Sequence, residues 1–232
     1  MSAIGVTGNE FVVEIAAGAA ERYRTPSLSD LLAWLRVELN DTVGSANEAG
    51  TYTEEELTHF LNRAKAEVEL RTRCHRARVS IPLTAGTHTY DTSPLFEAVE
   101  VSREGATLNV TALEDMSNLS QAWDGASNGT PKEALTLSGS QVRLYPPPDS
   151  AAAEHPLVVH GYATSEALVE GGATVTSIPA GYASQALLEG AKAFAYKARA
   201  SSPANLSLAA EAAAKFEAVC AQIVQALKAG AV

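Results

Sequence analysis

Four arginines gather in one short stretch of an otherwise acidic chain. Arg71, Arg73, Arg76 and Arg78 fall within eight positions, with His75 among them. One interpretation is a solvated helix end, where cations favour the negative end of the helix dipole. The other is a contact with an acidic protein surface or with DNA, because guanidinium groups pair with carboxylates and phosphates. The spacing is compatible with both interpretations.

The sequence offers little else that could do chemistry. It contains no Gly-rich phosphate loop, no nucleophile elbow and no His-Glu-x-x-His pair. His155 and His160 fall on opposite faces of a predicted strand start, so we interpret them as surface or packed histidines and not as a metal pair. The acidic run 54–56 opens a predicted helix, where carboxylates complement the helix dipole. We therefore expect no catalytic residues, no cofactor and no metal.

The composition is that of an ordinary globular protein. Of 232 residues, 46% are hydrophobic and 19% are charged, which argues against a disordered chain. Seventeen basic against 27 acidic residues give a net charge of −10, which argues against a freestanding nucleic-acid binder. Cys74 and Cys220 are too few and too far apart for a disulfide framework. No apolar stretch approaches about 18 residues, so we expect a soluble, non-secreted protein without a membrane segment.

Hydrophobic periodicity predicts two helices near each end of the chain. Ser27 and Thr53 each begin a capping box, and apolar residues follow at helical spacing, which predicts helices over 27–40 and 53–75. Towards the C-terminus the pattern predicts helices over 179–200 and 204–228. The second of these follows Pro203, which suits the first turn of a helix.

Between the helix pairs the hydrophobic period falls to two, which indicates strands. Turn residues at 85–86, 103–105 and 138–140 predict three hairpins that join consecutive strands. Pro82 favours an edge position for the first strand, and prolines at 146–148 end a later one. A short helical stretch is expected at 111–121. The predicted strands cover 79–83, 87–90, 98–101, 107–110, 133–137, 141–145 and 157–162.

These elements predict an α+β fold, mainly a helical bundle of about four helices with an inserted antiparallel β unit. Each helix pair alone would expose an apolar face, and packing the pairs together buries both. The expected organisation is an N-terminal arm at 1–26, a discontinuous helical bundle at 27–77 and 166–232, and the β unit at 78–165.

The order of several motifs resembles the head-to-tail connector (adaptor) proteins of tailed bacteriophages. The resemblance covers roughly 27–200 and rests on the ordered series, because no single motif is diagnostic. The leader 1–26 and the segment after Pro203 match no motif of the family. The motifs are Leu28 to Leu39; Tyr52-Thr53-Glu54-Glu55-Glu56-Leu57 running into Leu61-Asn62-Arg63-Ala64; Pro82-Leu83-Thr84-Ala85-Gly86-Thr87 with Tyr90-Asp91; Val99 to Gly105 with Leu108; Leu144-Tyr145-Pro146-Pro147-Pro148; and Tyr162 with Pro179 and Tyr182.

The resemblance implies a non-enzymatic part of the virion. Family members form rings, typically of twelve copies, that dock on the portal and offer the tail an attachment surface, with DNA passing through the channel. The implied partners are other copies of the chain, the portal protein, tail or neck proteins and transiently the genome, without a membrane. The implied location is the head–tail junction, after assembly in the host cytoplasm.

Two other classes remain open at this point. The β unit could be a glycan- or receptor-binding module of a tail-associated protein, with Trp123, Tyr145 and Tyr162 as stacking candidates. A small hydrolase is the weakest hypothesis, because the sequence lacks a recognisable nucleophile–base pair.

Overall fold

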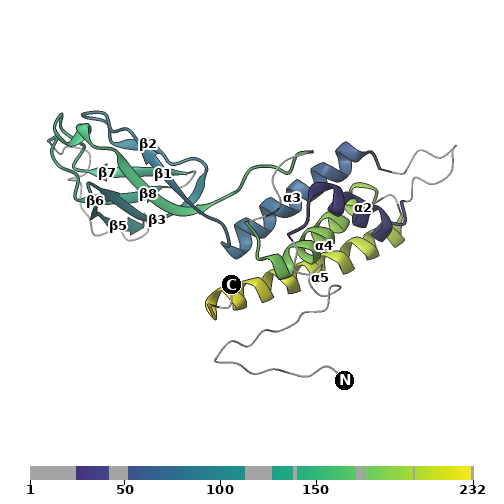
Figure 1. Ribbon diagram of the computed structural model, residues 1–232. Coiled ribbons are helices and arrows are strands. Elements are labelled where there is room, and N and C mark those ends of the chain that lie inside the picture. The colour runs from purple at the N-terminus through teal and green to yellow at the C-terminus, as the bar shows by residue number, and fades with distance from the viewer. Residues whose placement is uncertain are drawn as a thin grey trace, which may run out of the picture.

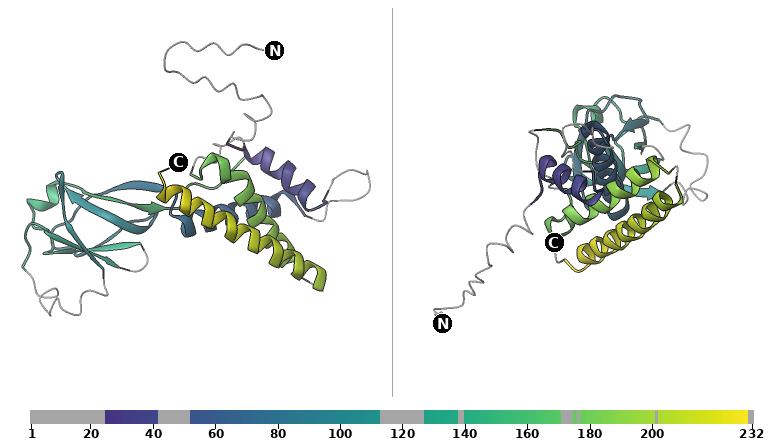
Figure 2. Two further views of the ribbon diagram at one scale, coloured as in Figure 1. Left: turned by 90° about the horizontal axis from the view of Figure 1, so that it is seen from below. Right: turned by 90° about the vertical axis from the view of Figure 1, so that its right-hand side faces the viewer.

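The computed structural model describes residues 25–41, 52–112, 127–137, 140–170, 175, 177–200 and 202–230. The described part of the chain is elongated, with helices at one end and strands at the other (Figure 1). The left view in Figure 2 shows the same arrangement, and the right view looks along the molecule from its helical end. The predicted α+β fold is confirmed, with four α-helices and two sheets among the described residues.

The four predicted helices are all present, with slightly different ends. They are α2 (Leu28–Glu38), α3 (Glu54–Thr72), α4 (Ala180–Ala198) and α5 (Pro203–Lys228). Both predicted capping boxes form, because Ser27 and Thr53 exchange hydrogen bonds with the third residue of their helices. Helix α3 ends where Arg73 adopts a left-handed backbone with φ of 54°.

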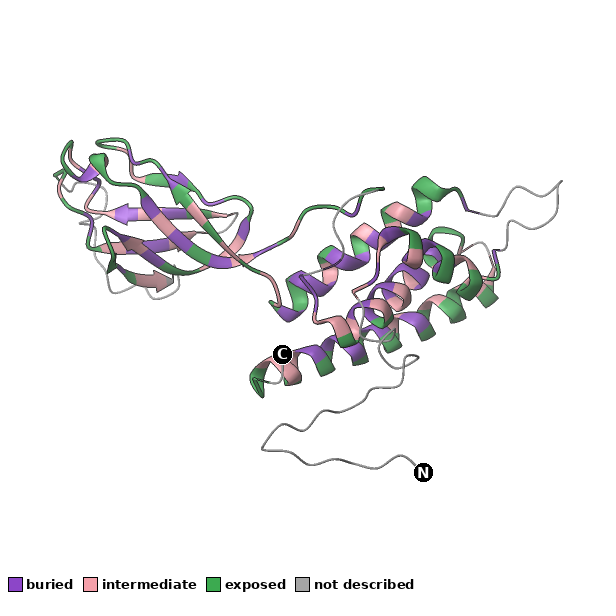
Figure 3. Ribbon diagram, viewed as in Figure 1, coloured by how far each residue is buried: buried purple, intermediate pink, exposed green. Residues whose placement is uncertain are grey.

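Apolar stripes of all four helices share one core, coloured as buried in Figure 3. Helix α4 packs against each of the other three. Its contact with α3 and α5 is close at Gly190, where an added Cβ would lie 2.8 Å from the Cβ of Ala64 and 2.9 Å from Cε2 of Phe216. The small residues of this region therefore allow the helices to approach each other. The core residues with no exposed surface include Leu31, Leu35, Leu57, Leu61, Val68, Leu187 and Ile223.

The strands form two four-stranded sheets that enclose a second core. In the first sheet the order is β1 (Arg76–Ile81), β8 (Leu157–Ala163), β3 (Leu95–Arg103) and β4 (Ala106–Thr107). In the second sheet the order is β2 (Thr89–Asp91), β7 (Gln141–Tyr145), β6 (Glu133–Leu137) and β5 (Asn109–Ala112). Strand β1 lies at an edge, as Pro82 predicts.

The first predicted hairpin is wrong, although its turn at 85–86 forms. Strand β1 pairs with β8, and β2 pairs with β7 in the other sheet. Pro82 has no N–H to continue the ladder, so β1 ends at Ile81 and the chain crosses between the sheets. The Tyr90 hydroxyl fixes the crossing turn by accepting from the Thr84 N–H (3.2 Å), while its single proton is shared between the carbonyls of Thr84 (3.0 Å) and Thr87 (3.1 Å).

The second and third hairpins form, with one difference in pairing. Strands β3 and β4 pair around the turn at 104–105, and β6 pairs with β7. The residues after β4 leave that hairpin and join the second sheet as β5, parallel to β6. Of the helical stretch expected at 111–121, residues 111–112 are strand instead, and 113–121 lie outside the described residues. All other strand pairs are antiparallel.

The bounds of arm, bundle and β unit remain a prediction. Residues 1–24 of the expected arm lie outside the described part of the chain. The described helices and strands have separate cores, which is compatible with the predicted division.

Candidate functional site

The four arginines lie along the connection between α3 and β1. Arg71 belongs to the last turn of α3, Arg73 is its C-cap residue, and Arg76 and Arg78 belong to β1. All four side chains are exposed. The cluster therefore sits where the helical part of the molecule meets the sheets, and its members have different surroundings.

Arg71 joins two helices of the bundle. Its Nε donates to Glu67 Oε2 at 2.9 Å, and its Nη1 pairs with Glu217 of α5. The guanidinium also lies 5.4 Å from the ring centroid of Phe216. Partial burial works to lower the pKa of Arg71, but its hydrogen bonds to Glu217 and Glu67 outweigh this and raise it. Arg71 thus has a structural task within the chain.

Arg73 and Arg76 flank the ring of Tyr162 on β8. Their guanidinium carbons lie 5.8 Å and 5.5 Å from its centroid, within reach of a cation–π contact. Arg73 also pairs with Glu97 of β3 at 2.7 Å. These contacts connect the α3–β1 junction to the first sheet. Tyr162, a candidate for stacking on a ligand, is engaged by the chain's own arginines.

Arg78 differs from the other three, because it forms no ion pair or hydrogen bond with any side chain that the structure describes. It is paired in register with His160 of β8, which is paired in turn with Glu100 of β3. A hollow of about 330 Å³ opens on this sheet face. We call it the basic hollow; its lining comprises Arg76, Ala77, Arg78, Val99, Glu100, His160 and Gly161.

A β-bulge shapes the basic hollow. The register of β3 against β8 shifts between Ala98 and Glu100, which leaves Val99 without a partner and 54% exposed. A Cβ on Gly161 would lie 2.2 Å from the Glu97 carbonyl oxygen, so only glycine permits this close approach. The sequence pattern gave no signal of the hollow, because cross-strand partners far apart in the chain create it.

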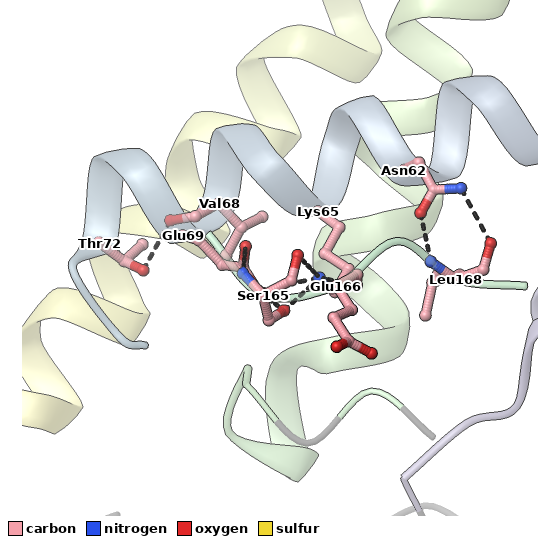
Figure 4. A network of polar contacts seen from close by, with 8 residues as sticks. All are labelled: Asn62, Lys65, Val68, Glu69, Thr72, Ser165, Glu166 and Leu168. Carbon is pink, nitrogen blue, oxygen red and sulfur yellow. Dashed lines mark hydrogen bonds and ion pairs between the residues drawn. The ribbon is translucent and has the colours of Figure 1, made fainter. Parts of the chain in front are cut away.

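The segment that follows β8, residues 164–170, runs along α3, and we call it the strap (Figure 4). Asn62 of α3 pairs with the backbone of Leu168 in both directions. Its Nδ2 donates to the Leu168 carbonyl at 3.1 Å, and its Oδ1 accepts from the Leu168 N–H at 2.6 Å. The Asn62 side chain thus satisfies both backbone hydrogen-bonding groups of Leu168, as a neighbouring β-strand would.

A buried ion pair holds the start of the strap. Lys65 and Glu69, one turn apart on α3, lie 3.2 Å apart and are almost completely buried. Glu69 accepts from the Ser165 N–H at 3.0 Å, and Lys65 donates to the carbonyls of Ser165 (3.2 Å) and Glu166 (2.8 Å). The Ser165 hydroxyl contacts both charged groups. Burial would raise the pKa of Glu69, but the hydrogen bonds from Ser165 and the charge of Lys65 lower it overall.

Sequence reasoning missed the strap and its partners. Asn62 stands in the Leu-Asn-x-Ala motif, which marks its position without revealing its task. Lys65 and Glu69 share a helix face with Leu61 and Val68. Charged residues inside an apolar stripe were the signal in the sequence that could have indicated a buried polar contact. The function of these residues is to position the chain as it returns from the sheets to α4.

The other candidate residues are not assembled into a site. His155 pairs with Glu104 at 2.6 Å, whereas His160 faces the basic hollow. Cys74 and Cys220 are free thiols. Tyr145 is half-buried on β7, and Trp123 lies outside the described residues. Within the described ranges there is no group of three His, Cys, Asp or Glu that could hold a metal, and no helix long and apolar enough to cross a membrane.

Comparison with known protein families identifies a family for this chain. The model of a family described as SU10 adaptor protein matches residues 26–231. The match spans all four described helices and both sheets. No curated protein matches the chain.

Proposed function

Because this chain belongs to the SU10 adaptor protein family, a family of phage head-to-tail adaptors, we propose that it forms a ring between the capsid portal and the tail. The ring has typically twelve copies, docks on the portal, offers the tail or neck proteins an attachment surface and lets the genome pass through its channel. The family match over residues 26–231 carries this proposal. The role is structural and not enzymatic, and the protein resides in the virion.

The structure supports this role through its two-part shape. Helices and strands have separate cores at opposite ends of the elongated molecule. The strap and the ion pair of Lys65 with Glu69 fix the chain where it passes from one part to the other. A ring closes only when the rotation from each subunit to the next divides a full turn. A fixed angle between the two parts keeps this rotation the same in every copy.

The charge of the chain suits a channel for DNA. A net charge of −10 per subunit, repeated around a ring, gives an acidic body. Phosphates are repelled by such a surface, so the genome slides with little adhesion. A channel that bound DNA tightly would retain it during ejection.

Against this background the arginine cluster serves best as a contact between proteins. Arg71, Arg73, Arg76 and Arg78 would meet an acidic portal surface or a neighbouring subunit, in preference to DNA. The planar guanidinium pairs with a carboxylate through two parallel hydrogen bonds, which gives such a contact a defined geometry. Arg71 and Arg73 already pair with carboxylates inside the chain, each carboxylate being met through a single nitrogen.

Electron microscopy of the purified protein mixed with a portal tests the proposal. We expect a ring bound coaxially to the portal. A monomer in free solution is compatible with the proposal, because the portal can template the ring. Failure of the folded protein to bind the portal at any concentration would contradict it.

The arginine contact has its own test. Replacing all four arginines with alanine should weaken docking on the portal and make the remaining binding less sensitive to salt. The variant must remain folded, and thermal unfolding checks this. Unchanged affinity and unchanged salt dependence would show that the cluster takes no part in docking.

A further inference from the structure

The basic hollow is a cationic sheet face that no acidic group from another part of the described chain covers. Among the described residues, Arg78 has no ion-pair or hydrogen-bond partner, and the side-chain contacts of Arg76 are with Tyr162 alone. His160 is exposed beside them, and Glu100 is the single carboxylate of the lining. The bulged Val99 adds an exposed apolar group. A fitting occupant therefore carries several carboxylates next to an apolar side chain.

A second surface of the same chain has this chemistry. A groove of about 800 Å³ lies between the first turns of α3 and the end of the strap, and we call it the acidic groove. Glu54, Glu55 and Glu170 line it, and none of them makes an ion pair or hydrogen bond with a described residue. Val169 stands beside Glu170 and is 59% exposed. The groove thus offers three carboxylates next to an apolar lining of Leu28, Ala167, Leu168 and the exposed Val169, with His59 also in the lining.

The two surfaces cannot satisfy each other within one chain. The acidic groove is at the start of α3, and the basic hollow begins four residues after its end. The 19 residues of α3 place its ends ~28 Å apart. A contact between two different surfaces of identical chains is heterologous, and repetition of such a contact closes a ring when the rotation permits.

We propose that the basic hollow of one copy binds the acidic groove of the next copy. The proposal rests on the ring proposed above and names the surfaces that build it. Arg76 and Arg78 pair with carboxylates of the neighbour, for which three are available. Val99 and Val169 lose exposed apolar surface in the same contact. Arg71 and Arg73, which already have acidic partners in their own chain, are not required.

Charge reversal on each surface tests the pairing. The hollow variant carries Arg76→Glu and Arg78→Glu, and the groove variant carries Glu55→Lys and Glu170→Lys. Each variant alone presents like charges at every contact between the hollow of one copy and the groove of the next. We therefore expect the affinity between subunits to fall roughly tenfold or more. An equimolar mixture presents opposite charges at every contact between unlike copies. It should therefore restore rings, with the two variants alternating.

The readout is sedimentation velocity and electron microscopy, with a portal present if the wild type needs one. A matched control carries Lys197→Glu and Lys228→Glu, exposed lysines of α4 and α5, and has the same net charge as the hollow variant. We expect this control to assemble as the wild type does. Thermal unfolding confirms that every variant is folded.

Each outcome decides the matter. Assembly restored by mixing supports the proposal. Loss in each variant without rescue in the mixture would show that the two surfaces do not meet, and unchanged assembly of the hollow variant would exclude the hollow from the interface. If that variant assembles but loses binding to a DNA duplex, the hollow belongs to DNA. Failure of the wild type itself to form rings would overturn the proposed function, which is a distinguishable result.

Discussion

Glu69 offers the most direct test of how the strap is held. Its side chain has no exposed surface, and it meets Lys65 and two donors of Ser165. Replacing it with glutamine keeps the shape but leaves the Lys65 charge buried without its counter-ion. Removing one member of a buried ion pair costs about 3–5 kcal/mol. Lys65 retains two carbonyl acceptors in the strap, so we expect Glu69→Gln to lower the free energy of unfolding by about 3 kcal/mol.

Urea unfolding followed by circular dichroism measures this loss. The matched control is Glu67→Gln on the same helix, because Glu67 pairs with Arg71 at the surface and should cost about 1 kcal/mol or less. Lys65→Met combined with Glu69→Gln removes both charges, so the double variant should be no less stable than Glu69→Gln alone. A loss below about 1 kcal/mol for Glu69→Gln would refute the structural role of the pair.

The pKa of Glu69 also gives the loss a dependence on pH. Because this pKa is lowered on folding, its contribution to stability is fully present above the ordinary value of 4.5 and is lost as the pH falls through the folded value. The difference in unfolding free energy between wild type and Glu69→Gln should therefore shrink below about pH 4.5. A difference that stays constant or grows on acidification would contradict the lowered pKa.

Three further experiments test the helix packing at Gly190, the hold of Asn62 on the strap and the burial of the Cys220 thiol. Gly190→Ala would place a methyl group 2.8 Å from the Cβ of Ala64, so we expect about 1–3 kcal/mol of destabilisation in thermal unfolding; an unchanged midpoint would show that α3 and α4 can separate freely. Asn62→Ala removes both hydrogen bonds to Leu168 and should cost about 1–3 kcal/mol, with faster hydrogen exchange in the strap; exchange equal to that of the wild type would contradict the clamp. Burial raises the pKa of Cys220 to about 11, so this thiol should react with iodoacetamide at pH 8 far more slowly than a free cysteine, and rapid labelling in the folded protein would be inconsistent with the burial.

Local signals predicted the helices well. The capping boxes at Ser27 and Thr53 and the proline at 203 depend on residues within one turn, and the structure places helix starts at these positions. The hairpin between β6 and β7 is similarly local, because its turn and both strands lie within 133–145. Where the determinants are neighbours in the chain, periodicity and turn residues suffice.

Long-range pairing could not be predicted in the same way. Strand β1 pairs with β8, whose residues lie about eighty positions later, and no local signal distinguishes this partner from the adjacent β2. The same limit applies to the arginines. Their spacing identified the cluster, but the acidic partners of Arg71 and Arg73, Glu217 and Glu97, come from other elements. Only the fold shows that Arg71 and Arg73 have acidic partners in the chain, whereas Arg76 and Arg78 line the basic hollow.

Cryo-electron microscopy of purified phage particles tests the central claim most directly. We expect a closed ring of this protein at the head–tail junction, in contact with the portal on one side and tail or neck proteins on the other. Its subunits should match the four-helix bundle and the two sheets described above. Absence of the protein from the particles, or its location away from that junction, would contradict the proposed role as an adaptor ring.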